Sequence, residues 1–595
     1  MKWKEKIKRN RWQLAVLVLV LLVQCNYISE KQGYHMDELL TFELANAEYN
    51  PWIVPTQPVG RLAKFMQQEI YGDSMGETLQ NIKNTVADVL RNRGNSKLLS
   101  YQADVYEEPV WITRDQFHEY ITVGDRDAFN YLSVYFNVKD DNHPPLYFML
   151  VHTLSSVFRG RISPWMGCVF NLAAVLGCCV IMFALGRLLA ACRFVEERTG
   201  ELWGLCGALL YGCSPGAIAT TLFIRMYGIL TFLCMLTLYL HLQKWLGPRT
   251  RTGKDFAKNN KLLILVTAMG FWTQYFFLFY CLLLALVTAV TLFRGGRKKE
   301  TFCYIRSMVI AAVVGVGIYP FGVKHILTSG RGVEAIGNLL SGLTGYGERL
   351  FSFGRILLLR VLGQKPLGLA AIGLLVMIGV ILLVRRKTRE SRSVRAAEQD
   401  KKDRRKLWWM LAFPPVGYFL LAAKMSPYMV DRYIMPVFPF AAMAFAGLLV
   451  YLLGRLKTEG ISVPLYAILL LSCLNVFTYD GEYLYTGYSF QLELTRERAD
   501  LPCICVYEGY SFYDNLQEFA LYDRTLLVKP SELTDRQDIA QLPEAMVIYK
   551  HNVDIDTQQE VGEILSGYGL TPHTFLMRET VYGDTIVYCV NESLN

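Results

Sequence analysis

The sequence has few charged residues for its length. Only 19% of its 595 residues are Asp, Glu, Lys or Arg, whereas soluble proteins carry roughly 25%. The deficit is local, because several stretches of about 20 residues are almost free of charge. A helix of that length satisfies its own backbone polar groups within lipid. The shortage of charge therefore excludes an ordinary soluble protein and predicts a polytopic α-helical membrane protein.

Other features are also missing. The 14 cysteines lie mostly in apolar segments without metal-ligand spacing, which indicates small buried hydrophobic residues. In the C-terminal region, the sequence leaves open whether Cys589 forms a disulfide with Cys503 or Cys505. No small-residue cleavage site follows the first apolar stretch, so we expect an uncleaved first helix with a cytoplasmic N-terminus. The net charge of +9 lies in short clusters between apolar stretches, which argues against nucleic-acid binding.

The apolar stretches predict a series of membrane-spanning helices. Spans are expected at 12–28, 164–190, 201–221, 226–243, 262–278, 279–293, 303–325, 366–384, 407–423, 434–454 and 461–478. Two shorter stretches, 145–158 and 351–362, are expected to lie at or dip into the outer interface, because every basic cluster then falls inside. The sequence thus predicts about 11 to 13 transmembrane helices, the higher number applying if both short stretches cross.

Two domains are predicted. The first is a transmembrane domain at 1–478, whose outer loop at 29–143 carries amphipathic helices. The second, at 479–595, is a small extracytoplasmic domain of α/β or α+β class. Its expected strands are ICVYE, FALYDRTLLVK, AMVIYK and TIVYCV, with helices near 510–520 and 557–567.

A pair of carboxylates, Asp37 and Glu38, follows the first predicted span. Adjacent carboxylates at a membrane surface are costly unless they are solvated or used. Neighbouring side chains cannot face the same target, so one would act as a general base while the other supports it. An ordinary solvated loop start is the alternative.

A second motif, Asp140-Asp-Asn-His-Pro-Pro-Leu-Tyr147, closes the long outer loop. The prolines fix the backbone and favour an extended His143. The motif is typical of a rigid helix entry that directs Asp141 and His143 toward the outer surface. A simple helix start is the alternative, although it would need neither residue.

Three cations, Arg225, Lys424 and Arg432, are predicted on the outer side, which the positive-inside rule disfavours. Both arginines stand near N-termini of inward-running helices, where the helix dipole favours anions. A guanidinium also binds phosphate with two parallel hydrogen bonds. The group indicates an anion held at the outer interface, with interfacial snorkelling as the alternative.

As a set, these motifs resemble those of the C-type membrane glycosyltransferases (GT-C), specifically the protein mannosyltransferase and aminoarabinose transferase-like family. The matching features are Asp37-Glu38, DNHPPLY at 141–147, SP followed by IRMYG at 214–228, and DRYIMPVFP at 431–439. The resemblance covers roughly residues 10–480. The polar cluster TQYFF at 273–277 departs from the pattern expected in many relatives.

The resemblance implies an inverting transfer of one sugar from a polyprenyl-phosphate donor to a protein, glycan or glycolipid acceptor in the cell envelope. Asp37 would be the general base and Glu38 would shape the site. Arg225, Lys424 and Arg432 would bind the donor phosphate. Donor or acceptor would be positioned by a further set of residues, namely Asp141, His143, Tyr227 and Tyr433. No metal or other cofactor is expected, because protein cations can neutralise the leaving phosphate.

Two other functions stay open. A ligase for whole lipid-linked glycans would be expected to need a divalent ion and more outer carboxylates. A lipid or polysaccharide transporter would need ionisable residues along a path deep within its helices, and the predicted spans are nearly clean of charge.

Overall fold

The computed structural model describes residues 10–49, 53, 56, 61–101, 106–139, 141–246, 260–363, 398–453, 463–479 and 481–594. The chain divides into two compact units. The helical unit comprises Met1–Glu30, Asp141–Tyr147 and Gly167–Glu482, and the sheet unit comprises Lys31–Asp140, Phe148–Met166 and Tyr483–Asn595. The predicted division after residue 478 stays a prediction. In the structure, the segment after the first helix shares a unit with the C-terminal strands.

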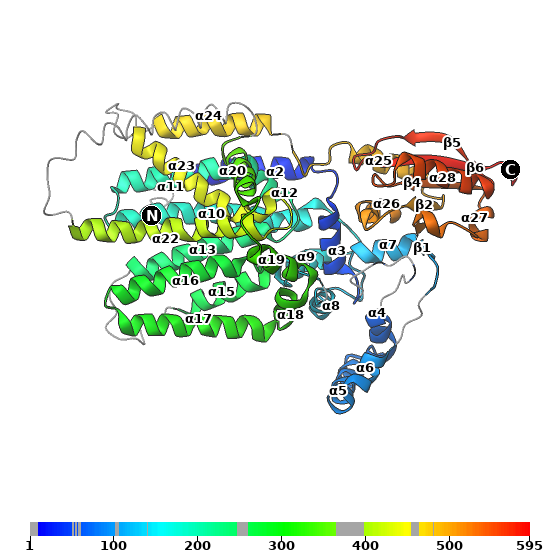
Figure 1. Cartoon of the computed structure of the whole chain (residues 1–595), viewed down its shortest axis with the longest axis horizontal. Coiled ribbons are helices and arrows are strands. Elements are labelled where there is room, and N and C mark those ends of the chain that lie inside the picture. The colour runs from blue at the N-terminus through cyan, green and yellow to red at the C-terminus, as the bar shows by residue number, and fades with distance from the viewer. Residues whose placement is uncertain are drawn as a thin grey trace, which may run out of the picture. The chain divides into compact units, whose positions relative to one another are not determined.

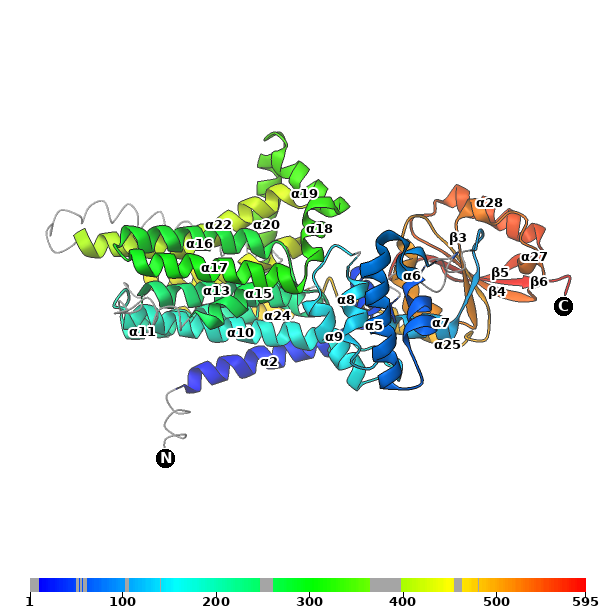
Figure 2. The same ribbon diagram turned by 90° about the horizontal axis from the view of Figure 1, so that it is seen from below.

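The helical unit consists of apolar helices that run side by side (Figures 1 and 2). Its elements are α2 (Arg11–Glu30), α10 (Pro164–Ala191), α11 (Glu197–Gly212), α12 (Pro215–Leu222), α13 (Tyr227–Leu246), α15 (Lys261–Thr273), α16 (Phe277–Arg294), α17 (Lys298–Ile318), α18 (Phe321–Thr328), α19 (Gly330–Leu340), α20 (Tyr346–Leu362), α22 (Glu398–Met425), η3 (Asp431–Tyr433), η4 (Met435–Val437), α23 (Phe438–Leu453) and α24 (Val463–Thr478).

Six of the described helices are long and apolar enough to cross a membrane, namely α2, α10, α13, α16, α17 and α22. The pair α11 and α12, bent by 56°, adds a seventh if it forms one span. This confirms a mostly helical membrane protein with several spans. The total of about 11 to 13 crossings and the sidedness of the termini stay predictions. The expected span at 366–384 lies outside the described residues.

Two expected spans are interrupted by proline. The stretch 201–221 divides because α12 begins at Pro215, where Ser214 caps the new helix by accepting a hydrogen bond from the Ala217 backbone N–H at 3.1 Å. Proline lacks an N–H and suits a first helical turn. The stretch 303–325 divides at Pro320, which separates α17 from α18. The two expected spans therefore each contain a break, and α11 with α12 and α17 with α18 are the helices on either side of it.

Glycines let α10 and α11 approach closely. A Cβ added at Gly186 would stand 2.1 Å from the carbonyl oxygen of Gly200, and one at Gly204 would stand 2.9 Å from that of Met182. Small residues permit such backbone contact between helices in a membrane, where apolar surface alone drives no association. This packing holds the framework on which the loop after α12 is mounted.

The sheet unit combines one mixed sheet with short helices. Its helical elements are α3 (Met36–Asn46), α4 (Arg61–Phe65), the π-helical turn η1 (Met66–Ile70), α5 (Met75–Asn92), η2 (Arg93–Asn95), α6 (Lys97–Ser100), α7 (Arg114–Ile121), α8 (Tyr131–Asn137), α9 (Leu146–Val157), α25 (Tyr488–Arg496), η5 (Ser511–Asn515), α26 (Leu516–Phe519), η6 (Pro530–Glu532), α27 (Gln537–Ala540) and α28 (Ile555–Gly567). Its strands are β1 (Trp111–Thr113), β2 (Cys503–Val506), β3 (Arg524–Val528), β4 (Glu544–Tyr549), β5 (Leu570–Met577) and β6 (Thr585–Asn591).

The strand order in the sheet is β1-β3-β2-β4-β6-β5. Strands β3, β2 and β4 are parallel, and β1, β5 and β6 pair antiparallel. Four strands coincide with the four predicted ones, whereas β5 and the short β1 were not predicted. Strand β2 is buried at all four positions, as expected for a central parallel strand covered on both faces. On one face, strand side chains such as Ile504 and Val547 pack against Val561 and Leu565 of α28.

The cysteines of the sheet are free thiols. Cys503 and Cys505 lie on β2 and Cys589 lies on β6, with β4 between the two strands. Two strand spacings of about 4.8 Å exceed the Cα separation of about 4.4 to 6.8 Å that a disulfide spans. The bridge considered for Cys589 therefore does not form.

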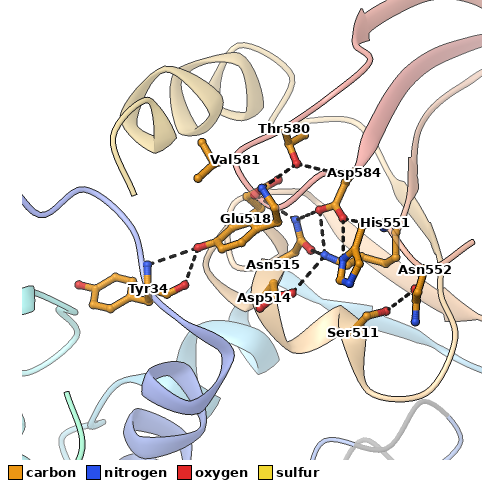
Figure 3. A network of polar contacts seen from close by, with 12 residues as sticks. Tyr34, Ser511, Asp514, Asn515, Glu518, His551, Asn552, Thr580, Val581 and Asp584 are labelled. Atoms are coloured by element: carbon orange, nitrogen blue, oxygen red, sulfur yellow. Dashed lines mark hydrogen bonds and ion pairs between the residues drawn. The ribbon is translucent and has the colours of Figure 1, made fainter. Parts of the chain in front are cut away.

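A polar cluster lies at the carboxyl ends of β2 and β4 (Figure 3). Lys550 follows β4, and its ammonium donates to Asp584 Oδ2 at 2.8 Å and to Asn515 Oδ1 at 2.6 Å. The side chains of Lys550 and Asp584 are fully buried. Asp514 lies 3.7 Å from the same ammonium. A buried ammonium and carboxylate of this kind require each other, because either alone would lose its hydration uncompensated.

Glu518 of α26 is buried beside this polar cluster. Its Oε1 accepts hydrogen bonds from Gln491 Nε2 at 2.6 Å and from Asn515 Nδ2 at 3.1 Å. Burial, with the charge of Asp584, raises the pKa of Glu518 to about 7. The carboxyl group is therefore protonated in the folded protein at a pH where an unfolded glutamate is ionised.

We expect Glu518 to make stability depend on pH. Its raised pKa leaves stability intact below the ordinary value of 4.5 and reduces it as pH rises toward about 7. A shift of this size corresponds to a loss on the order of 3 kcal/mol. Glu518→Gln keeps the acceptor oxygen and removes the ionisation, so it should raise the thermal unfolding temperature at pH 8 and change it little at pH 5. Glu563→Gln, at an exposed position of α28, serves as control. Equal effects of Glu518→Gln at both pH values would contradict the expectation.

Candidate functional site

The loop between α12 and α13 presents Arg225 and Tyr227. Helix α12 ends at Leu222, and Asn171 of α10 donates a hydrogen bond from Nδ2 to the Phe223 carbonyl at 2.7 Å. Helix α13 then begins at Tyr227, whose ring stacks on Phe223 with centroids 6.0 Å apart and planes 14° apart. Arg225 therefore lies just before the N-terminus of a 20-residue helix, where the dipole favours anions.

Asp141, His143 and Arg225 form a contiguous group within the helical unit. His143 Nδ1 lies 2.9 Å from Asp141 Oδ2 and 3.4 Å from Arg225 Nη2. Burial alone would raise the pKa of Asp141, but the charge and hydrogen bond of His143, with the charge of Arg225, hold it below its usual value. Asp141 is thus ionised, and its shorter contact favours the histidine tautomer protonated on Nδ1.

Arg432 comes to the same aromatic ring from the other end of the sequence. Its guanidinium carbon lies 5.9 Å from the Phe223 ring centroid and 5.7 Å from that of Tyr433. The predicted residues Tyr227 and Arg432 therefore both lie at the ring of Phe223, while Arg225, two residues further along the same loop, has its guanidinium beside His143. A guanidinium beside an aromatic ring is a group that can bind an anionic headgroup.

Arg432 is positioned by an ion pair of its neighbour. Asp431 lies 2.8 Å from Nη2 of Arg360, and the side chains of Asp431 and Arg360 are 3% and 9% exposed. Arg360 also pairs with Glu482. Asp431 and Arg432 are consecutive residues of the 3-10 turn η3. The side chain of Asp431 is directed toward Arg360, and that of Arg432 lies at Phe223.

Tyr433 completes this turn. Its carbonyl accepts a hydrogen bond from the Tyr418 hydroxyl at 3.1 Å, and its ring packs on Phe276 with centroids 5.9 Å apart. Phe276 belongs to the TQYFF segment, whose role the sequence left open. Its neighbour Tyr275 donates or accepts a 2.8 Å hydrogen bond with His325 Nδ1.

Lys424 is engaged elsewhere. Its ammonium donates to Ser341 Oγ at 2.9 Å and to the Gly342 carbonyl at 2.7 Å, and it lies 5.5 Å from the Tyr346 ring centroid. These contacts attach the end of α22 to the connection between α19 and α20. None of these contacts involves Arg225 or Arg432. The phosphate-binding role expected for Lys424 stays a prediction.

The acidic segment, Lys31–Glu38, belongs to the sheet unit. His35 caps helix α3 by accepting a hydrogen bond from the Asp37 backbone N–H at 3.0 Å, and Glu38 accepts one from the His35 N–H at 2.7 Å. Glu38 also pairs with the ammonium of Lys31 at 2.9 Å, and both side chains are fully buried. Asp37 remains 20% exposed, with its carboxylate 3.7 Å from His35 Nδ1.

Within this pair, the two carboxylates differ in environment. Glu38 is used for the cap and for Lys31, whereas Asp37 keeps access to solvent. Their contacts and exposure differ, but they do not test the expectation that one residue acts and the other supports it. The roles themselves stay predictions.

Three residues of these arrangements were missed by sequence reasoning, namely Lys31, Phe223 and Arg360. Lys31 and Arg360 are cations within or beside apolar segments, and such residues carry a signal because they need partners. Phe223 gives no such signal among the many aromatic residues of the spans. Among the described residues, no group of three or more His, Cys, Asp or Glu side chains is arranged to hold a metal ion. The expectation that no metal or other cofactor is required stays a prediction.

Comparisons with known proteins give structural neighbours only. No family model and no curated protein matches the chain. Among solved structures, ArnT from Cupriavidus metallidurans bound to undecaprenyl phosphate matches with a TM-score of 0.49 and 12% identity, covering 97% of this chain and 98% of that chain. The neighbours are ArnT structures. A second, ArnT in the apo state, matches with a TM-score of 0.42 and 12% identity over 75% of this chain and 87% of that chain.

An identity of 12% says nothing about which sugar or acceptor is used.

We expect the Arg360–Asp431 pair to contribute strongly to stability. Arg360→Met removes the guanidinium partner of a buried carboxylate, which costs about 3–5 kcal/mol in comparable pairs. The double variant Arg360→Met/Asp431→Asn should recover part of this loss in thermal unfolding of the purified protein. Arg331→Met, which removes an exposed pair with Glu334, should cost less than about 1 kcal/mol. Additive losses in the double variant would show that the pair is not coupled.

Proposed function

We propose that this protein transfers a single sugar from a polyprenyl-phosphate carrier to a hydroxyl-bearing acceptor at the outer membrane face. The observation that carries the proposal is that one loop of the helical unit brings Arg225 beside the Asp141–His143 pair and Phe223 beneath the guanidinium of Arg432. Two guanidiniums in a helical membrane unit are suited to a lipid-linked phosphate, which presents one anionic head and an apolar chain.

The donor phosphate is proposed to lie against both guanidiniums. Arg225 is almost fully buried, so its charge acts in a medium of low effective dielectric, where it stabilises an anion more than in water. His143 lies beside Arg225, and the negative charge of Asp141 stabilises its guanidinium from the same side. Tyr227 and Tyr433 supply aromatic surface against which a sugar ring can pack.

Asp37 is proposed to act on the acceptor. It is the carboxylate of the acidic segment that keeps solvent access, while Glu38 is committed to Lys31 and to the helix cap. A carboxylate hydrogen-bonded to an acceptor hydroxyl can take its proton as the bond to the sugar forms.

The proposed reaction is a single displacement. The acceptor oxygen attacks the anomeric carbon of the sugar, its proton passes to Asp37, and the bond between the sugar and the phosphate oxygen breaks. Polyprenyl phosphate leaves with the electron pair, and Arg225 and Arg432 stabilise the negative charge that develops on it. One displacement inverts the anomeric configuration. No metal ion is required, because protein cations neutralise the leaving group.

We expect Asp37→Asn to lower kcat by about 100-fold or more, the usual contribution of a general base. The measurement is transfer of radiolabelled sugar from polyprenyl-phosphate donors in membranes, with EDTA present to test whether a metal is needed. Asp115→Asn is the matched control, because Asp115 also lies in the first turn of a helix and is exposed. Undiminished transfer by Asp37→Asn would remove Asp37 as the base.

We expect Arg432→Gln to lower kcat/KM for the lipid donor by about 10–100-fold, since a hydrogen bond to a charged group contributes about 1.5–3 kcal/mol. The same assay is run as a titration of donor concentration. Arg306→Gln, at an exposed position of α17, should leave the value unchanged. If Arg432→Gln bound and used the donor as the unaltered protein does, the phosphate site would have to lie elsewhere.

A further inference from the structure

The C-terminal part of the sheet unit holds the acidic segment through several main-chain contacts. The Lys31 ammonium donates to the Tyr483 carbonyl at 2.7 Å, and the Gln32 N–H donates to the Leu484 carbonyl at 2.8 Å. The Gly487 N–H in turn donates to Gln32 Oε1 at 2.7 Å. Two stretches of chain more than 450 residues apart are thus joined by one backbone–backbone hydrogen bond and by two that use the side chains of Lys31 and Gln32.

The approach at Gly33 is so close that no side chain fits there. A Cβ at this position would stand 2.8 Å from Tyr485 Cβ and 3.0 Å from Tyr488 Cγ. A Cβ atom can move only with its backbone, and Tyr488 Cβ would also lie close, at 3.1 Å. The acidic segment therefore has little freedom relative to residues 485–488.

Tyr582 binds both backbone groups of one residue in the acidic segment. Its hydroxyl donates to the Tyr34 carbonyl at 2.7 Å and accepts from the Tyr34 N–H at 3.3 Å. Its ring packs edge-on against Tyr488, with centroids 5.3 Å apart. Tyr34 is followed by the cap residue His35 and then by Asp37, so this contact lies three residues from the proposed base.

The polar cluster contacts the ring of Tyr582. Lys550 Nζ lies 5.7 Å from the centroid of the Tyr582 ring, and Asp584, two residues further along the chain, holds that ammonium. The cluster lies where β2 and β4 end, and the chain leaves β2 in one direction for β3 and crosses to the other side for β4. Carboxyl ends at such a switch point are where open α/β sheets usually bind ligands.

In this protein, the chain's own acidic segment is attached beside that edge. We propose that Tyr582 is a positioning residue for the transfer reaction, fixing the acidic segment so that the Asp37 carboxylate is aimed at the acceptor. This rests on the proposed function. The C-terminal sheet then acts as the rigid support of the base, with the Lys550–Asp584 pair fixing Tyr582 in turn.

Positioning predicts a particular kinetic signature. A displacement of about 1 Å at a reacting group can reduce the rate about 100-fold, while a lipid donor held by arginines of the helical unit is bound as before. Tyr582→Phe removes only the hydroxyl and keeps the ring. We expect kcat to fall about 10–100-fold, with KM for the polyprenyl-phosphate sugar within about twofold.

Two variants accompany this measurement. Tyr588→Phe is the matched control, because it removes a tyrosine hydroxyl that donates to Glu544 on a neighbouring strand of the same sheet, and it should leave kcat unchanged. Gly33→Ala disturbs the same attachment from the opposite side. It should reproduce the fall in kcat at unchanged donor KM.

A double-mutant cycle with Asp37→Asn decides between positioning and a general loss of activity. If Tyr582 acts through Asp37, then Tyr582→Phe should reduce kcat no further in the Asp37→Asn background. Losses that multiply in the double variant would overturn the inference. So would full activity of Tyr582→Phe beside an inactive Asp37→Asn, which leaves the proposed function intact. Full activity of Asp37→Asn would overturn the proposed function and this inference together.

Discussion

The free energy required to bury a charged side chain constrains both units of this protein. An ammonium or guanidinium removed from water needs a carboxylate at hydrogen-bonding distance, because breaking such a pair costs several kcal/mol. The helical unit meets the requirement with Arg360 and Asp431, and the sheet unit meets it with Lys550 and Asp584. Each pair joins segments that are separated in the sequence by other helices or strands, so satisfying the charges also determines which backbone segments meet.

The same constraint separates the tasks of adjacent residues. In the acidic segment, Glu38 is bound to Lys31 and buried, and its neighbour Asp37 is left accessible. In the turn η3, Asp431 is bound by a guanidinium, and its neighbour Arg432 reaches the ring of Phe223. In each of these charged dipeptides, one residue forms a buried ion pair, and the side chain of its neighbour points in another direction. This geometry makes the anchored residue as necessary to the site as the one proposed to act.

The extent to which the sequence predicted this structure follows from the range of the interactions involved. Apolar helices are encoded locally, so their positions agreed to within a few residues, except where Pro215 and Pro320 divide a stretch. Strands with a strong β-branched pattern were also found. Strand β1 was missed because three residues carry no periodicity, and its pairing with β3 depends on a segment some 400 residues away. The bond between Tyr34 and Tyr582 has no local signal at all.

Candidate residues were predictable where a charge stood in an unfavourable place, as with Arg225 and Arg432, since such a charge needs a compensating partner or ligand. The partners of these charges were not predictable from the sequence, because any of several carboxylates could have formed the ion pair with Arg360. The C-terminal sheet is an example of such a partner that the sequence does not reveal. A parallel sheet offers its carboxyl edge to loops of any origin, and here the polar cluster at that edge adjoins Tyr582, which binds the segment carrying Asp37. A region without recognisable motifs can therefore position the proposed base, since positioning needs shape and hydrogen bonds and not a particular sequence.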